Sequence, residues 1–171
     1  MGKIQLYIAS SLDGYIARDS GEVDWLFSDR DYGYTEFLAQ IDTVLMGNKT
    51  YQQLLGFGEY PYSGKTAFVF SRTLAGQKDE RVEFIGGELQ DFVQGLQKTS
   101  TGNIWLVGGS EIIYAFLKHG LVDEFILSVH PVILGSGIPL IVRDRTLFTT
   151  LELQDVKTYK TGLVQLSYRK I

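Results

Sequence analysis

The sequence has no cysteine and only two histidines, His119 and His130. Without cysteine there can be neither a disulfide bond nor a thiolate metal site. Two histidines are too few for a histidine metal cluster, and nothing in their surroundings suggests a nucleophile–histidine–acid triad. His119 is interpreted as a charge near a helix C-terminus and His130 as an ordinary strand residue, so no metal site is expected.

Long apolar runs and concentrated positive charge are also missing. No stretch approaches the roughly 18 consecutive apolar residues that a membrane-spanning helix needs. The net charge is −4 and the lysines and arginines are scattered, which argues against nucleic acid or an anionic membrane as a partner. The first residues already alternate like a strand and lack the apolar segment of a signal peptide, so we expect a cytoplasmic protein.

Strand-like and helix-like segments alternate along most of the chain. Strands are predicted at 3–9, 43–46, 66–70, 82–85 and 104–107. Helical stripes occur at 34–41, 50–55, 88–98 and from 112 to near Gly120. Beyond that glycine the pattern becomes strands alone, at 123–134, 148–159 and 163–170, with Pro131 at a bulge or edge because it has no N–H to donate. This order predicts one α/β domain over residues 1–171. It has a mixed, mostly parallel central sheet, helices on both faces and an antiparallel C-terminal edge.

Three junctions between a strand and the following turn could bind a ligand, since ligands of open α/β sheets lie beyond the carboxyl ends of parallel strands. The first is 45–51, where a glycine precedes a helix start with a cation and a hydroxyl. The second is 68–72, where Ser71 and Arg72 suit a phosphate monoester. The third is 105–114, where Gly108 and Gly109 could expose backbone N–H groups to a diphosphate. Each of the three also has a simpler interpretation, namely a capped turn, a solvated arginine and a plain Gly-Gly turn.

Together these segments resemble the dihydrofolate reductase superfamily, in particular the branch of RibD C-terminal, riboflavin-biosynthesis reductase-like domains. The resemblance covers nearly the whole chain and rests on five short motifs in the family's order. They lie at 8–17, 46–51, 71–72, 107–111 and 131–140. The resemblance implies a three-layer αβα fold of the dihydrofolate-reductase type.

The resemblance also implies NADPH as the cofactor. It assigns the adenosine 2′-phosphate and the diphosphate to Gly47, Asn48, Lys49, Thr50, Ser71 and Arg72. It assigns further diphosphate contacts, with a cis peptide between the two glycines, to Val107, Gly108, Gly109, Ser110, Glu111 and Ile112. The nicotinamide would touch Ala9, Ile16 and Ala17.

The substrate side matches the family less closely. Riboflavin-pathway reductases commonly carry an acidic residue where this chain has Val107, and dihydrofolate reductases carry a carboxylate on the first helix. Asp29 and Asp31 are the candidates for that carboxylate, with a solvated helix start as the other interpretation, and Ser128 occupies the position of the family's threonine partner. The catalytic candidates are therefore Asp31, Asp29 and Ser128. The residues expected to contact the substrate are Ile8, Trp25, Phe27, Tyr51 and Phe57.

The resemblance thus implies an NADPH-dependent oxidoreductase that transfers hydride to a small heterocyclic substrate. The leading candidate is a 5-amino-6-(5-phosphoribosylamino)uracil reductase-like enzyme of riboflavin biosynthesis. A dihydropterin reductase and a general carbonyl reductase remain open. So does a protein of another class, one that binds NADP(H) without catalysis. A homodimer that pairs through the apolar segment 131–142 is expected.

Overall fold

The strands of the computed structural model, which describes residues 1–171, form an eight-stranded sheet in the order β5-β4-β3-β6-β1-β7-β10-β9, with a separate pair β2-β8. The elements in chain order are β1 (Ile4–Ser10), β2 (Tyr15–Ala17), α1 (Tyr34–Ala39), β3 (Ile41–Gly47), α2 (Asn48–Gly56), β4 (Thr66–Phe70), β5 (Glu83–Ile85), α3 (Leu89–Thr99), β6 (Asn103–Gly108), α4 (Ser110–Lys118), β7 (Glu124–Val129), β8 (Ile138–Pro139), β9 (Leu151–Thr158) and β10 (Val164–Lys170).

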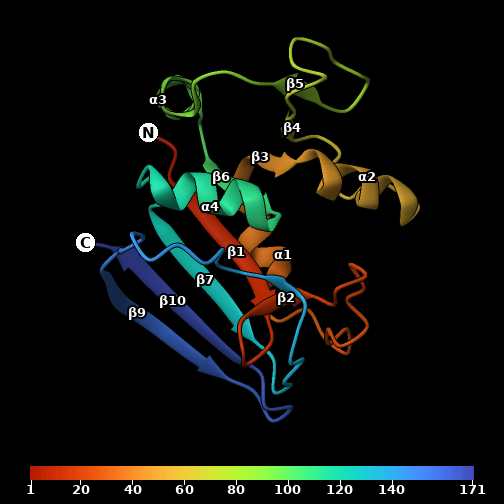
Figure 1. Ribbon diagram of the computed structural model, residues 1–171, viewed down its shortest axis with the longest axis vertical. Helices are drawn as coiled ribbons and strands as arrows, with labels where there is room; N and C mark the ends of the chain where they lie inside the picture. Colours follow the sequence, from red (N-terminus) through yellow and green to blue (C-terminus); the bar gives the residue numbers. More distant parts are fainter.

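Every neighbouring pair from β5 to β7 is parallel, whereas β10 runs antiparallel to both β7 and β9. Helices cover both faces of the parallel part (Figure 1). One core holds side chains of α3 and α4 with Leu6 and Leu106, and the other holds side chains of α1 and α2 with Val44 and Trp105. The predicted three-layer fold with a mixed sheet and an antiparallel edge is therefore confirmed.

The alternation of side chains along β1 explains the two cores. Ile4, Leu6 and Ile8 point to the α3/α4 side, and Tyr7 points to the α1/α2 side, where it stacks on Phe37 with ring centroids 4.1 Å apart. A parallel strand covered on both faces is buried on both, which is why its sequence shows few polar residues.

One predicted strand is wrong in its extent. The segment 123–134 was predicted as one long strand with Pro131 at a bulge or edge, but β7 ends at Val129 and the proline lies outside it. The residues after it turn away, because the Asp13 carboxylate accepts hydrogen bonds from the backbone N–H groups of Leu134 and Gly135. The chain then forms β8, which pairs with β2, a sheet that the periodicity did not predict.

None of the helices is long and apolar enough to cross a membrane.

Candidate functional site

The candidate site lies at the carboxyl edge of the parallel strands. Met46 of β3 pairs with Gly108 of β6, and Gly47 pairs with Phe70 of β4, so the three strands end side by side. Helix α2 begins directly after β3, and α4 begins two residues after β6. Figure 1 shows both helices leaving this edge. The first N–H groups of a helix have no partner within the helix, so two sets of free donors and two positive dipole ends meet here.

Because of glycines, no side chains cover the backbone between these two helix starts. A Cβ atom on Gly47 would lie 4.0 Å from the Gly108 oxygen and from the Gly109 nitrogen, and one on Gly109 would lie 3.4 Å from Thr50 Oγ1. Gly108 has a φ of 126°, which favours glycine. The peptide bond between Gly108 and Gly109 is cis, which confirms that expectation. The first and third predicted junctions therefore form one continuous backbone surface.

The two cations expected at a phosphate are both available. Lys49 and Arg72 are exposed, and neither takes part in the ion pairs of the structure, which are Lys3–Glu124, Arg18–Asp24, Arg30–Asp29, Arg81–Glu80 and Arg169–Glu152. An anion that docked at this edge would meet guanidinium and ammonium groups that make no competing ion pair.

Unlike the two cations, several polar side chains at the same edge are hydrogen-bonded within the protein. Ser71 Oγ accepts from the Leu74 N–H at 3.1 Å and Ser110 Oγ donates to the Pro139 oxygen, so both hydroxyls serve the fold. The Asn48 side chain accepts from Gln52, and Glu111 is exposed on the first turn of α4. The Ser71 backbone N–H is also occupied, because it donates to the Ile85 oxygen, whereas the Asn48 amide N–H groups donate to no protein group in these bonds.

The apolar residues predicted to contact the nicotinamide, the diphosphate or the substrate divide between the two sides of the sheet. The Ile8 side chain lies 3.6 Å from the Cβ position of Gly108, and with Ile16 and Ile112 it packs against the α3/α4 core. Ala17 is buried in β2. Ala9 points to the opposite side of β1, and Val107 packs against the α1/α2 core.

A row of three residues crosses the sheet on the Ala9 side. Ala9 pairs with Ser128, and Ser128 pairs with Gln165 of β10. The Gln165 amide donates to Ser128 Oγ at 3.1 Å, and both side chains are buried. Next to the row, burial raises the pKa of Tyr7 to about 12. The sequence analysis missed Gln165 and Tyr7. The signal for Gln165 was a polar residue at the inward position of the apolar strand 163–166.

Asp29 and Asp31 are both exposed and both hydrogen-bonded within the loop before α1. Asp29 accepts from the Tyr32 hydroxyl at 2.6 Å, and this bond lowers the pKa of its carboxyl. Asp31 accepts from the hydroxyl and the N–H of Thr35, which lowers its pKa as well. Both groups are therefore carboxylates near neutral pH and cap the helix region. Their catalytic role, and that of Ser128, stays a prediction.

The residues predicted to contact the substrate come together only in part. Trp25 and Phe27 both lie against His130, with ring centroids 5.3 Å and 4.9 Å from the imidazole. Tyr51 is 1% exposed and its hydroxyl donates to Asp79, so its contact with the substrate stays a prediction. Phe57 is exposed, but it follows the last turn of α2, at the opposite end of the helix from Lys49.

Comparison with known proteins finds matches over most of the chain. The family model of the RibD C-terminal domain matches residues 62–165. The uncharacterized protein YwjB of Bacillus subtilis (strain 168) is 41% identical over 170 residues, 97% of each chain. The uncharacterized protein YyaP of the same organism is 39% identical over 178 residues, which cover 97% of this chain and 94% of YyaP.

Solved structures with the same fold include a protein assigned to riboflavin biosynthesis in Shewanella sp. PV-4. Its TM-score is 0.87 at 29% identity, over 100% of this chain and 99% of that one. A diaminohydroxyphosphoribosylaminopyrimidine deaminase/5-amino-6-(5-phosphoribosylamino)uracil reductase of Thermotoga maritima has a TM-score of 0.76 at 17% identity. That match covers 99% of this chain and 57% of the longer protein, and it concerns the fold alone.

Proposed function

The chain belongs to the family of the RibD C-terminal domain, and from this premise we propose that it is an NADPH-dependent reductase. Its substrate would be a small heterocycle of the 5-amino-6-(5-phosphoribosylamino)uracil type, the compound that the Thermotoga maritima protein is named for. A cytoplasmic location belongs to the same proposal. The observation that carries it is the meeting of the α2 and α4 starts at one glycine-lined edge beside Lys49 and Arg72.

The residues at this edge fit a dinucleotide with a 2′-phosphate. The free N–H groups of the two helix starts suit a diphosphate, and the bare backbone at Gly47 and Gly109 lets it approach closely. Lys49 and Arg72 supply positive charge for the additional phosphate that distinguishes NADPH from NADH. When bound, NADPH supplies the hydride, and the protein supplies orientation and electrostatics.

The chain's own residues would act on the substrate from the Ala9 side of the sheet. Trp25 and Phe27 offer aromatic surface for a flat ring, and Ser128 offers a hydroxyl beside Ala9. The lowered pKa values of Asp29 and Asp31 favour a carboxylate that holds a water or a substrate N–H in place over an acid that gives up its own proton.

The test is a fluorescence titration with NADPH and NADH on the wild type, on Arg72→Ala and on the control Arg145→Ala. Arg145 is another exposed arginine, between β8 and β9 and outside the site. We expect NADPH to bind more tightly than NADH. Arg72→Ala should weaken NADPH binding by about 1.5–3 kcal/mol, the worth of a charged hydrogen bond, and leave NADH binding and the control unchanged.

Equal affinity for the two nucleotides would contradict the role given to Arg72, and no binding of either would contradict the proposed function. Oxidation of NADPH in the presence of an aminopyrimidine acceptor separates a reductase from a protein that only binds the nucleotide.

The proposal also includes a homodimer that pairs through the segment 131–142. Ile133 and Ile141 of this segment are 73% and 46% exposed, which is a high exposure for large apolar side chains. Light scattering should give twice the chain mass of 19.2 kDa. A mass near that of one chain would contradict the dimer.

A further inference from the structure

His130 is the next residue after Ser128 on the same face, beside the row formed by Ala9, Ser128 and Gln165. Successive side chains of an extended segment alternate between faces, so His130, two residues after Ser128, follows it on the same side. The His130 N–H donates to the Ser10 oxygen at 2.8 Å, which keeps the residue against the end of β1. His130 is thus on the ligand-binding side of the carboxyl edge, next to the row that contains Ala9.

The imidazole of His130 is enclosed by aromatic side chains. It is 3% exposed, and the Trp25 ring stands at 86° to it while the Phe27 ring lies tilted at 50°. Trp25 and Phe27 come from the loop before α1, and Phe27 also stacks on Tyr32. These rings offer flat apolar faces beside the imidazole.

Hydrogen bonding determines which nitrogen of His130 carries the proton. Nδ1 lies 3.1 Å from the Ser128 carbonyl oxygen, and because a carbonyl only accepts, Nδ1 is the donor. Burial lowers the pKa of His130, so the ring is neutral near pH 7. Nε2 therefore presents a lone pair, and no protein group donates to it.

The neighbouring indole of Trp25 has a hydrogen-bond donor without an acceptor. Trp25 is buried, and its Nε1–H has no acceptor in the protein. A buried donor without a partner is unfavourable, so such groups in native proteins call for a partner outside the chain, either a water or a ligand. An acceptor on His130 and a donor on Trp25 thus stand unpartnered on two rings in edge-to-face contact.

We propose that His130 Nε2 and Trp25 Nε1–H together bind the lactam edge of the substrate, accepting from its ring N–H and donating to its adjacent carbonyl oxygen. This inference rests on the proposed function and narrows the substrate to a neutral heterocycle with a uracil-like edge.

The test uses two probes that differ only at the lactam edge, 5,6-diaminouracil and 1,3-dimethyl-5,6-diaminouracil. Calorimetric titrations are run on the wild type, on His130→Phe, which keeps the ring, and on His130→Gln, which keeps an acceptor near the position of Nε2. His119→Phe is the matched control, since His119 is exposed at the end of α4. Trp25→Phe removes the second hydrogen bond and keeps aromatic surface.

The wild type and the control should prefer 5,6-diaminouracil by about tenfold or more, because methylation removes the N–H that Nε2 accepts from. His130→Phe should reduce this preference to below about threefold, and His130→Gln should restore most of it. Trp25→Phe should weaken binding of both probes, because both keep their carbonyl oxygens. A thermal unfolding midpoint close to that of the wild type shows that each variant is folded.

An equal preference in the wild type and in His130→Phe would overturn the inference and make His130 a core residue. Failure of both probes to bind would overturn it too, while NADPH binding would still uphold the cofactor site. Binding of the probe that depends on His130, without any binding of NADPH, would uphold the inference and overturn the reductase proposal. If His130→Phe does not fold, the inference is tested by His130→Gln, which should keep most of the preference, and by Trp25→Phe, which should weaken binding of both probes.

Discussion

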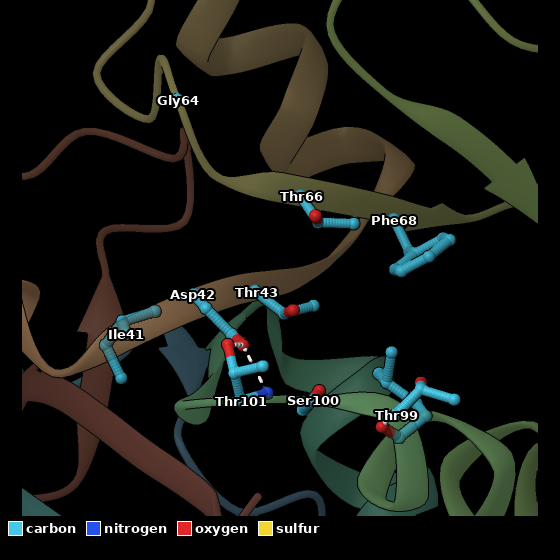
Figure 2. Close-up of a pocket in the computed structure, with 10 residues that line it drawn as sticks. Ile41, Asp42, Thr43, Gly64, Thr66, Phe68, Thr99, Ser100 and Thr101 are labelled. Carbon is cyan, nitrogen blue, oxygen red and sulfur yellow. Dashed lines mark hydrogen bonds between the residues drawn. The ribbon is translucent and has the colours of Figure 1, made fainter.

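The two edges of the sheet use their charged groups in opposite ways. The amino edge has a hollow of about 520 Å³ between the start of β4 and the end of α3, lined largely by hydroxyl side chains (Figure 2). Its carboxylate, Asp42, accepts from the N–H and the hydroxyl of Thr101 and from the Gly102 N–H. Lys65, the residue before β4, donates to the carbonyl oxygens of Leu38 and Ile41.

At the carboxyl edge the cations Lys49 and Arg72 have no ion-pair partner, and His130 Nε2 has no donor. The amino edge also has unpartnered atoms, Asp42 Oδ1 and Ser100 Oγ, but its charges are held by donors and acceptors of the protein itself. The polar groups that line the hollow at the amino edge thus serve largely to hold the protein together, whereas the cations at the carboxyl edge are left without an ion-pair partner.

Removing the Asp42 carboxylate gives the largest expected effect on stability. Asp42→Ala leaves the N–H groups of Thr101 and Gly102 without their acceptor, so we expect the free energy of unfolding to fall by about 1–3 kcal/mol. Affinity for NADPH should stay the same. Urea unfolding and a nucleotide titration measure the two quantities, and weaker NADPH binding in this variant would show that the two edges are coupled.

Removing the Lys49 ammonium should weaken NADPH binding and leave stability unchanged, the reverse of what is expected for Asp42→Ala. The expected change in free energy is also smaller. Because Lys49 is exposed and unpaired, Lys49→Ala should leave the free energy of unfolding within about 0.5 kcal/mol of the wild type. NADPH affinity should fall about fivefold, roughly 1 kcal/mol, and the loss should shrink as salt is added. Lys98→Ala, on the last turn of α3 near the amino edge, is the control, and an equal loss there would mean that only net charge matters.

The smallest expected effect is a difference in acid sensitivity at the amino edge. Burial acts to raise the pKa of Asp42, but the hydrogen bonds from Gly102, Thr43 and Thr101 outweigh it, and the net pKa is lowered. A carboxyl whose folded-state pKa is lowered adds stability above its unfolded-state value, near 4, and this stability is lost as pH falls through the folded-state value.

Below about pH 4 the wild type should therefore lose more stability than Asp42→Asn, which cannot titrate. Urea unfolding at several pH values measures this. Parallel curves for the two proteins over the acid range would show that Asp42 is not a source of acid sensitivity.

Local signals predicted most of the fold and the strand ends that meet at the proposed cofactor site. The apolar run 66–70 is β4 with the same bounds, and the strand at 104–107 differs from β6 by one residue at each end. Prediction was weaker where pairing joins distant segments. Tyr15 pairs with Pro139 in a sheet that neither segment shows by itself, and β7 ends before Pro131, where the prediction had continued it.

The side chains of the substrate side were also decided by distant contacts. Tyr51 follows Lys49 and Thr50 in a motif that suggested ligand contact, but the loop with Asp79 covers it. His130, interpreted as an ordinary strand residue, lies against Trp25 and Phe27 because a loop about a hundred residues earlier in the chain packs onto the end of β7.

The sequence by itself determined the alternation of strands and helices, the glycines after β3 and β6, and the cations beside them, because periodicity and turn chemistry act over a few residues. Only the tertiary structure decided which polar groups are left without a partner. Ala9, Ser128 and Gln165 form one row through the register of three strands, and that register joins residues far apart in the chain, more than a hundred positions for Ala9 and Ser128 and 37 for Ser128 and Gln165.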